Sequence, residues 1–205
     1  MRSGRDRRPA RRKPHLSPKP RILVLCEGER SEPEYLRGFR LAFRNPLVDL
    51  EIAKERGVPA TLVREAKRLK KEADDEAKRK RDENLRYDQV WIAFDVDEHP
   101  KVAEAVDKAR SNGIHVALSN PCFELWLLLH SRESPGMQNR HEVQRMVGKI
   151  DGDRGKGVDF NRYKDRYGVA LERARRLHTE AESMGEAGRN PTTWFYLLTE
   201  EIRGS

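Results

Sequence analysis

The chain has 205 residues, of which 36% are hydrophobic and 37% are charged, and its formal net charge is +8. This length is enough for one α/β domain with a substantial core and too short for two domains of full size. No stretch is apolar for long enough to act as a signal peptide or to span a bilayer, so we expect a cytoplasmic protein without a membrane partner. Cys26 and Cys122 lie in apolar segments, so we expect reduced, buried thiols and neither a disulfide nor a structural zinc site.

The positive charge is concentrated at the N-terminus. Residues 1–20 contain eight basic residues and one acidic residue, so they account for most of the net charge of +8. This segment also contains four prolines and little apolar area to bury, so we predict a disordered basic tail. Residues 21–205 then form the domain, and its nearly neutral charge offers little electrostatic attraction for nucleic acid.

Four apolar segments predict strands, at residues 22–26, 48–53, 89–95 and 114–118. The segments between them have helical patterns, which cover residues 32–43, 60–84 and 102–111. An alternation of strands and helices implies right-handed crossovers between parallel strands. We therefore predict an α/β fold with a mainly parallel, four-stranded sheet and helices on both faces.

The last third of the chain, residues 131–205, is predicted to be a mostly helical C-terminal extension. Residues 131–159 look irregular apart from a short helix near 141–147, and a charged helix is expected over 162–184. A final helix follows Asn190-Pro191-Thr192-Thr193. The glycine-rich segment 152–157 follows no strand and lacks a Gly-Lys-Ser/Thr ending, which excludes a P-loop.

Acidic residues follow two of the predicted strands. Glu27 and Glu29 come after the first strand, and Asp95 and Asp97 come at the end of the third. Open α/β sheets bind ligands beyond the carboxyl ends of their strands, and residues two apart on an extended backbone project to the same side. Two adjacent carboxylates repel each other unless a cation neutralises them, and Mg²⁺ prefers oxygen ligands. One interpretation is therefore a metal site, and the other is a solvated, Asp-rich turn that caps the next helix.

Glu124 is the only acidic residue in the apolar helix predicted after residue 119. A carboxylate among apolar residues costs free energy unless a metal or a basic partner compensates it. Alternatively, Glu124 is a first-turn residue that the helix dipole favours.

Four stretches of the sequence resemble the RloB family. They are Cys26-Glu27-Gly28-Glu29 with Glu32-Pro33, Phe94-Asp95-Val96-Asp97, Ser119-Asn120-Pro121-Cys122-Phe123-Glu124-Leu125-Trp126, and Asn190-Pro191-Thr192-Thr193. That family looks like a divergent member of the TOPRIM superfamily, the Mg²⁺-binding fold shared by topoisomerases, bacterial primases and OLD-type nucleases. The resemblance implies a TOPRIM-like, Rossmann-like sheet and a Mg²⁺ or Mn²⁺ cofactor.

The resemblance also implies roles for individual residues. In the superfamily, a Glu after the first strand and an Asp-x-Asp after a later strand form the metal site, and these match Glu27 and Asp95 with Asp97. The third Asp of some TOPRIM proteins has no clear counterpart here, because the position two after Asp97 is His99, and this leaves open whether one or two metals bind. Further candidates for a second metal or for the outer shell are Glu29, Glu32 and Glu124.

A metal-dependent nuclease is the function that this resemblance favours. A topoisomerase would need an additional tyrosine domain, and a primase would need zinc-binding and helicase-interacting parts, for which the chain has no room. RloB-like proteins are encoded beside ATPases of the ABC/SMC-like type in prokaryotic restriction and abortive-infection loci. We therefore expect nucleic acid and such an ATPase as partners, and a role in anti-phage defence.

Two other functions fit the same residues. A phosphatase of the haloacid dehalogenase type also has a strand followed by Asp-x-Asp, and it would form a phosphoaspartate at Asp95. It would need a later acidic pair at a strand end, and Asp151 and Asp153 lie in a glycine-rich loop instead. A noncatalytic adaptor would use the same body to bind its ATPase, although the presence of all three acids argues against it.

Overall fold

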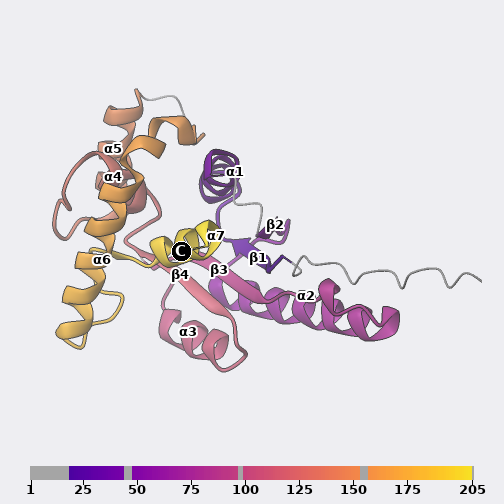
Figure 1. Ribbon diagram of the computed structural model, residues 1–205. Helices are drawn as coiled ribbons and strands as arrows, with labels where there is room; N and C mark the ends of the chain where they lie inside the picture. The colour runs from indigo at the N-terminus through magenta and orange to yellow at the C-terminus, as the bar shows by residue number, and fades with distance from the viewer. Residues whose placement is uncertain (1–18, 44–47, 97–98, 153–156, 205) are drawn as a thin grey trace, which may run out of the picture.

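The computed structural model describes residues 19–43, 48–96, 99–152 and 157–204 (Figure 1). The predicted basic tail lies outside the described residues, except for Lys19 and Pro20, which are exposed. Asp97 and Asp153 also lie outside them.

A five-stranded, mostly parallel sheet forms the centre of the fold. Its strands are β1 (Arg21–Cys26), β2 (Asp49–Ile52), β3 (Gln89–Asp95), β4 (His115–Asn120) and β5 (Thr192–Thr193). They lie in the order β2-β1-β3-β4-β5, and the first four are mutually parallel. The α/β class and the four parallel strands agree with the sequence prediction.

The prediction of four strands is wrong by one, because β5 adds an antiparallel strand beside β4. β5 has two residues, which pair with Ser119 and Asn120, and the Thr193 and Ser119 hydroxyl groups are 2.9 Å apart. The sequence Thr192-Thr193 resembles the start of a helix when it is read alone. Only contact with a strand more than 70 residues earlier makes it a strand.

Helices cover both faces of the sheet. One face packs against α2 (Pro59–Lys80) and α3 (Val102–Arg110), where alternate strand residues such as Leu23 and Ile92 are buried. The side chains between them, such as Val24 and Ala93, enter a second core with five helices. These are α1 (Ser31–Phe43), α4 (Glu124–Ser131), α5 (Arg140–Asp151), α6 (Tyr167–Ser183) and α7 (Phe195–Arg203). Figure 1 shows α1, α4 and α5 on one side of the strands and α2 and α3 on the other.

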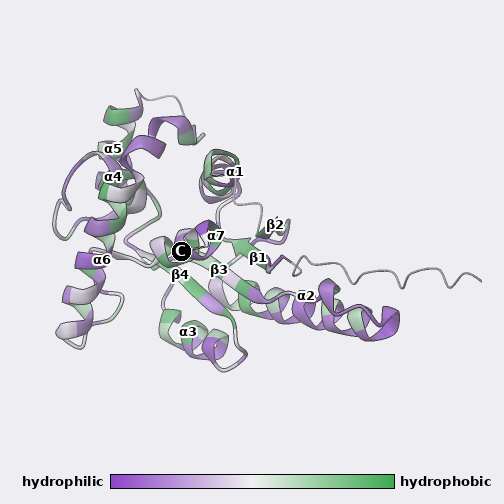
Figure 2. Ribbon diagram, in the orientation of Figure 1, coloured by the Kyte–Doolittle hydropathy of each residue, from purple (hydrophilic) through white to green (hydrophobic). Residues whose placement is uncertain are grey.

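Two predicted helices have different ends in the structure. α2 stops at Lys80, because Arg81 adopts a left-handed conformation with a φ of 54°, and a short 3-10 helix at Glu83–Leu85 follows. The second half of α2 is hydrophilic, as Figure 2 shows. The helix expected from residue 162 begins at Tyr167, after two 3-10 turns at Phe160–Arg162 and Lys164–Arg166.

The region predicted to be irregular contains a full helix, α5. It starts after Asn139, whose side chain accepts a hydrogen bond from the backbone N–H of Glu142 at 3.0 Å, and it ends at Gly152. It is therefore longer than the short helix expected near residues 141–147. Within the described part of the chain, no helix has the length and apolar character needed to cross a membrane.

Candidate functional site

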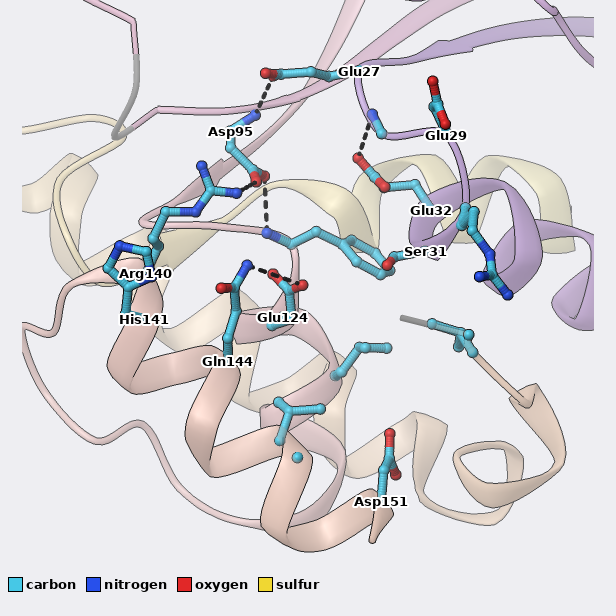
Figure 3. Close-up of a pocket in the computed structure, with 18 residues that line it drawn as sticks. Glu27, Glu29, Ser31, Glu32, Asp95, Glu124, Arg140, His141, Gln144 and Asp151 are labelled. Atoms are coloured by element: carbon cyan, nitrogen blue, oxygen red, sulfur yellow. Dashed lines mark hydrogen bonds and ion pairs between the residues drawn. The ribbon is translucent and has the colours of Figure 1, made fainter. Parts of the chain in front are cut away.

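Glu27 and Asp95 meet at the carboxyl ends of two neighbouring strands. β1 and β3 are parallel, and Cys26 pairs with Ala93, so Glu27 follows β1 close to the point where Asp95 ends β3. Glu27 Oε2 accepts a hydrogen bond from the backbone N–H of Asp95 at 3.1 Å (Figure 3). The topology thus brings together two acids that are 68 residues apart in the sequence.

His99 contacts the other oxygen of Glu27. Its Nε2 atom is 2.7 Å from Glu27 Oε1, and the two side chains are 15% and 23% exposed. The Glu27 carboxylate is therefore held from two sides, by His99 and by the Asp95 backbone. His99, two residues after Asp97, thus contacts the first acid of the site.

Asp95 lies between a backbone donor and a guanidinium group. Its Oδ1 atom accepts a hydrogen bond from the Phe123 N–H at 2.8 Å, and Oδ2 is 3.8 Å from Arg140 Nη2. Burial raises the pKa of Asp95 well above its ordinary value, and the negative charges of nearby glutamates raise it further. The Arg140 charge opposes these effects without removing them. Burial, more than the neighbouring charges, therefore disfavours a negative charge on Asp95.

Glu32 adds a buried carboxylate on the α1 side of the site. Only 5% of this residue is exposed, and its Oε1 atom accepts a hydrogen bond from the Gly28 N–H at 3.2 Å. Burial raises the pKa of Glu32, and the charges of Glu124 and Glu27 add to the effect. A Cβ atom at Gly28 would lie 2.2 Å from Glu32 Oε2, so this close approach requires a glycine.

These residues line a cavity of about 830 Å³ (Figure 3). Its described lining contains six carboxylates and two guanidinium groups, those of Arg30 and Arg140. Glu29 and Glu124 belong to the lining, and Glu124 Oε1 accepts a hydrogen bond from Gln144 Nε2 at 3.4 Å. The cavity is therefore strongly acidic on the side of the sheet edge.

The donor set fits a hard cation such as Mg²⁺. Among the residues that the structure describes, no group of three or more His, Cys, Asp or Glu side chains is arranged to hold a metal ion. The donors at the sheet edge are nevertheless carboxylate oxygens, which Mg²⁺ prefers, and a bound cation would favour the charged forms of Asp95 and Glu32, whose pKa values are raised by burial and, to a smaller extent, by neighbouring carboxylates. Asp97, the other predicted ligand, lies outside the described residues.

The structure brings five of the six candidate acids to one cavity. They are Glu27, Glu29, Glu32, Asp95 and Glu124. Sequence reasoning missed the contribution of α5, which places Arg140, His141 and Gln144 on the opposite wall. The sequence does indicate that these residues share one side of a helix, because they are spaced at i, i+1 and i+4 after the capping residue Asn139. This spacing does not indicate which part of the sheet the helix faces.

A comparison with protein families gives one match. The model of the family described as RloB-like protein matches residues 22–202, nearly the whole chain. The chain belongs to the RloB-like family. Its matched region includes both strand ends of the site and the α5 wall. No curated protein and no solved structure matches the chain.

Proposed function

We propose that this RloB-like protein is a divalent-metal-dependent nuclease that hydrolyses phosphodiester bonds in nucleic acid. The proposal depends on one observation, the convergence of Glu27 and Asp95 at a sheet edge, among further carboxylates on a cavity wall. Enzymatic phosphoryl transfer needs charge neutralisation and positioning much more than covalent participation of the protein. A carboxylate cluster meets this need through the cation that it binds.

In this proposal Glu27, Asp95 and Asp97 hold Mg²⁺ or Mn²⁺, and the remaining glutamates complete the outer shell or hold a second ion. A bound ion would neutralise phosphate charge and lower the pKa of a bound water. The chain itself orients the ligands: His99 and the Asp95 N–H fix Glu27, and the Phe123 N–H fixes Asp95. Ligands fixed in this way need little reorganisation when the ion binds.

Arg140 supplies the positive charge that a phosphate needs next to the carboxylates. Its guanidinium group lies 3.8 Å from Asp95 Oδ2, and the two side chains are 20% and 15% exposed. A guanidinium in such a recessed position can donate hydrogen bonds to the non-bridging oxygens of a phosphate, on which negative charge accumulates during hydrolysis. We assign Arg140 this role.

The family also supports a TOPRIM-type site and a partner protein. The resemblance of RloB-like proteins to the TOPRIM superfamily agrees with parallel strands that end in a Glu and an Asp. We propose that the protein is the effector of an anti-phage system and acts with an ABC/SMC-like ATPase encoded nearby. Outside residues 1–20 the chain is close to neutral, so we expect weak binding to nucleic acid when the ATPase is absent.

A nuclease assay tests the proposal. The full chain, alone and with its ATPase, is incubated with plasmid DNA and with total RNA in Mg²⁺ and then in Mn²⁺. Asp95→Asn should abolish cleavage, because the amide keeps the acceptor for the Phe123 N–H but loses the charge that binds the cation.

The matched control is Asp107→Asn, which removes an exposed acid of α3 outside the cavity and should leave cleavage unchanged. Equal cleavage by the wild type and Asp95→Asn would refute the assignment. A phosphorylated Asp95 would favour the phosphatase, and a stable complex with the ATPase without turnover would favour the adaptor.

A further inference from the structure

Asp95 and Glu32 lie in a recess of the protein surface. Asp95 is 15% exposed, and Glu32 is 5% exposed. The cavity volume of about 830 Å³ lies within the range of roughly 300–1,000 Å³ that is typical of pockets enclosing a small ligand. A phosphate that reacts beside Asp95 must therefore enter the cavity, because Asp95 and Glu32 do not project to an open surface.

Part of the wall opposite the sheet edge is apolar. Leu127 of α4, Val147 of α5 and Val158 line the cavity, and Leu127 and Val147 are buried. Apolar side chains gain nothing from contact with a phosphate, but they suit the face of a nucleobase. The cavity thus offers carboxylates for a cation and its phosphate, and an apolar part of the opposite wall for a base.

Helix α5 forms this wall with one face. Its residues that line the cavity are Arg140, His141, Gln144, Val147, Gly148 and Asp151, and Figure 3 shows α5 running beside the carboxylates. Arg140 at its start lies next to Asp95, Gln144 lies next to Glu124 a turn later, and Val147 and Gly148 follow before Asp151. A nucleotide with its phosphate at Arg140 would therefore have its base beside Val147 and Gly148.

A base-paired nucleotide cannot occupy such a cavity. In a duplex the base is stacked and paired, and enzymes that act in enclosed pockets use single strands or extrude the nucleotide. We propose that the substrate is single-stranded nucleic acid, bound with one unpaired nucleotide in this cavity. This inference rests on the proposed nuclease function and names the substrate class of the same site.

Gly148 allows a steric test that leaves the carboxylates intact. It lies inside α5 on the stripe that contains Gln144 and Asp151, so a larger side chain there would project along the cavity wall. Gly148→Phe should reduce the space for a base. Gly148→Ala is the matched control, because both substitutions remove a helix-interior glycine, whose cost is about 1 kcal/mol, and only one is bulky.

The assay measures binding and cleavage separately. Fluorescence anisotropy with Ca²⁺ in place of Mg²⁺ compares a labelled single strand with its duplex, as DNA and as RNA, and a nucleoside monophosphate serves as competitor. We expect the wild type and Gly148→Ala to bind the single strand at least tenfold more tightly than the duplex. Gly148→Phe should lose at least tenfold in single-strand affinity, whereas Mn²⁺ affinity measured by calorimetry stays within twofold.

Equal affinity for duplex and single strand, or equal affinity of Gly148→Phe and Gly148→Ala, would overturn the inference. Binding of the monophosphate without binding of any strand would also overturn it and would assign the cavity to free nucleotides. Failure of the nuclease function has a different signature. The expected binding pattern without cleavage in Mg²⁺ or Mn²⁺, with the ATPase present, would refute the nuclease and leave the single strand as a ligand.

Discussion

Acidification should destabilise the protein through His130. This histidine is 1% exposed and lies in a cluster of aromatic rings. Its Nδ1–H donates to the Trp126 carbonyl at 2.9 Å, and its Nε2 accepts from the Tyr35 hydroxyl at 3.1 Å, which is the arrangement of a neutral ring. Burial, together with the charge of Arg173, lowers the pKa of His130 to about 4.

The loss of stability follows from the difference between the folded and unfolded chain. An unfolded histidine has a pKa near 6.5, so between pH 6.5 and 4 the unfolded chain binds a proton that the folded protein does not. The contribution of His130 to the free energy of unfolding is therefore intact above pH 6.5 and falls as the pH decreases from 6.5 to 4. At roughly 1.4 kcal/mol for each pH unit, the loss reaches about 2 kcal/mol at pH 5 and about 3 kcal/mol near pH 4.

Urea unfolding at pH 7 and pH 5 checks this value in the wild type and in His130→Gln. Glutamine can accept a hydrogen bond from the Tyr35 hydroxyl and does not titrate. The free energy of unfolding of the variant should therefore fall by about 2 kcal/mol less than that of the wild type between pH 7 and pH 5. The raised pKa values of Asp95 and Glu32 shift stability in the opposite direction in both proteins, so the comparison isolates the histidine. His115→Gln, at an exposed position, is the control and should behave like the wild type. The same loss in wild type and His130→Gln would refute the reasoning.

Three further predictions concern the site. Asp95→Asn removes a buried charge, so it should raise the melting temperature in metal-free buffer at neutral pH by about 2–4 °C, which corresponds to about 1 kcal/mol. The variant should also lack any rise in melting temperature that Mg²⁺ causes in the wild type, and a lower melting temperature in metal-free buffer would contradict this prediction. Gly28→Ala should lower the free energy of unfolding by about 1–3 kcal/mol, because the new Cβ atom displaces Glu32. Urea unfolding should show a smaller loss when the same substitution is made in a Glu32→Ala background, and an equal loss would exclude the clash. His99→Ala should lower kcat about 10- to 100-fold with little change in KM, since His99 orients Glu27, and His99→Gln should recover part of the rate. Unchanged kinetics would show that His99 does not position Glu27.

Short-range patterns were sufficient to predict the parallel strands and the two acids at their ends. Apolar segments of five to seven residues with helices between them are typical of parallel sheets, and parallel strands end at a common edge. The proximity of Glu27 to Asp95 follows from these two rules, and the 3.1 Å hydrogen bond agrees with it. The family resemblance was likewise visible in the motifs, and the match over residues 22–202 confirms it.

The features that complete the cavity depend on contacts between distant segments. β5 exists because Thr192 and Thr193 meet the end of β4, and α5 places Arg140 beside Asp95 because it packs on α4. The periodicity of a helix identifies its apolar face but not the element that covers this face, and a two-residue strand has no periodicity at all. The acids were therefore predictable from residues near them in the sequence, whereas the guanidinium group, the apolar wall and the histidine beside Glu27 were determined by packing across the fold.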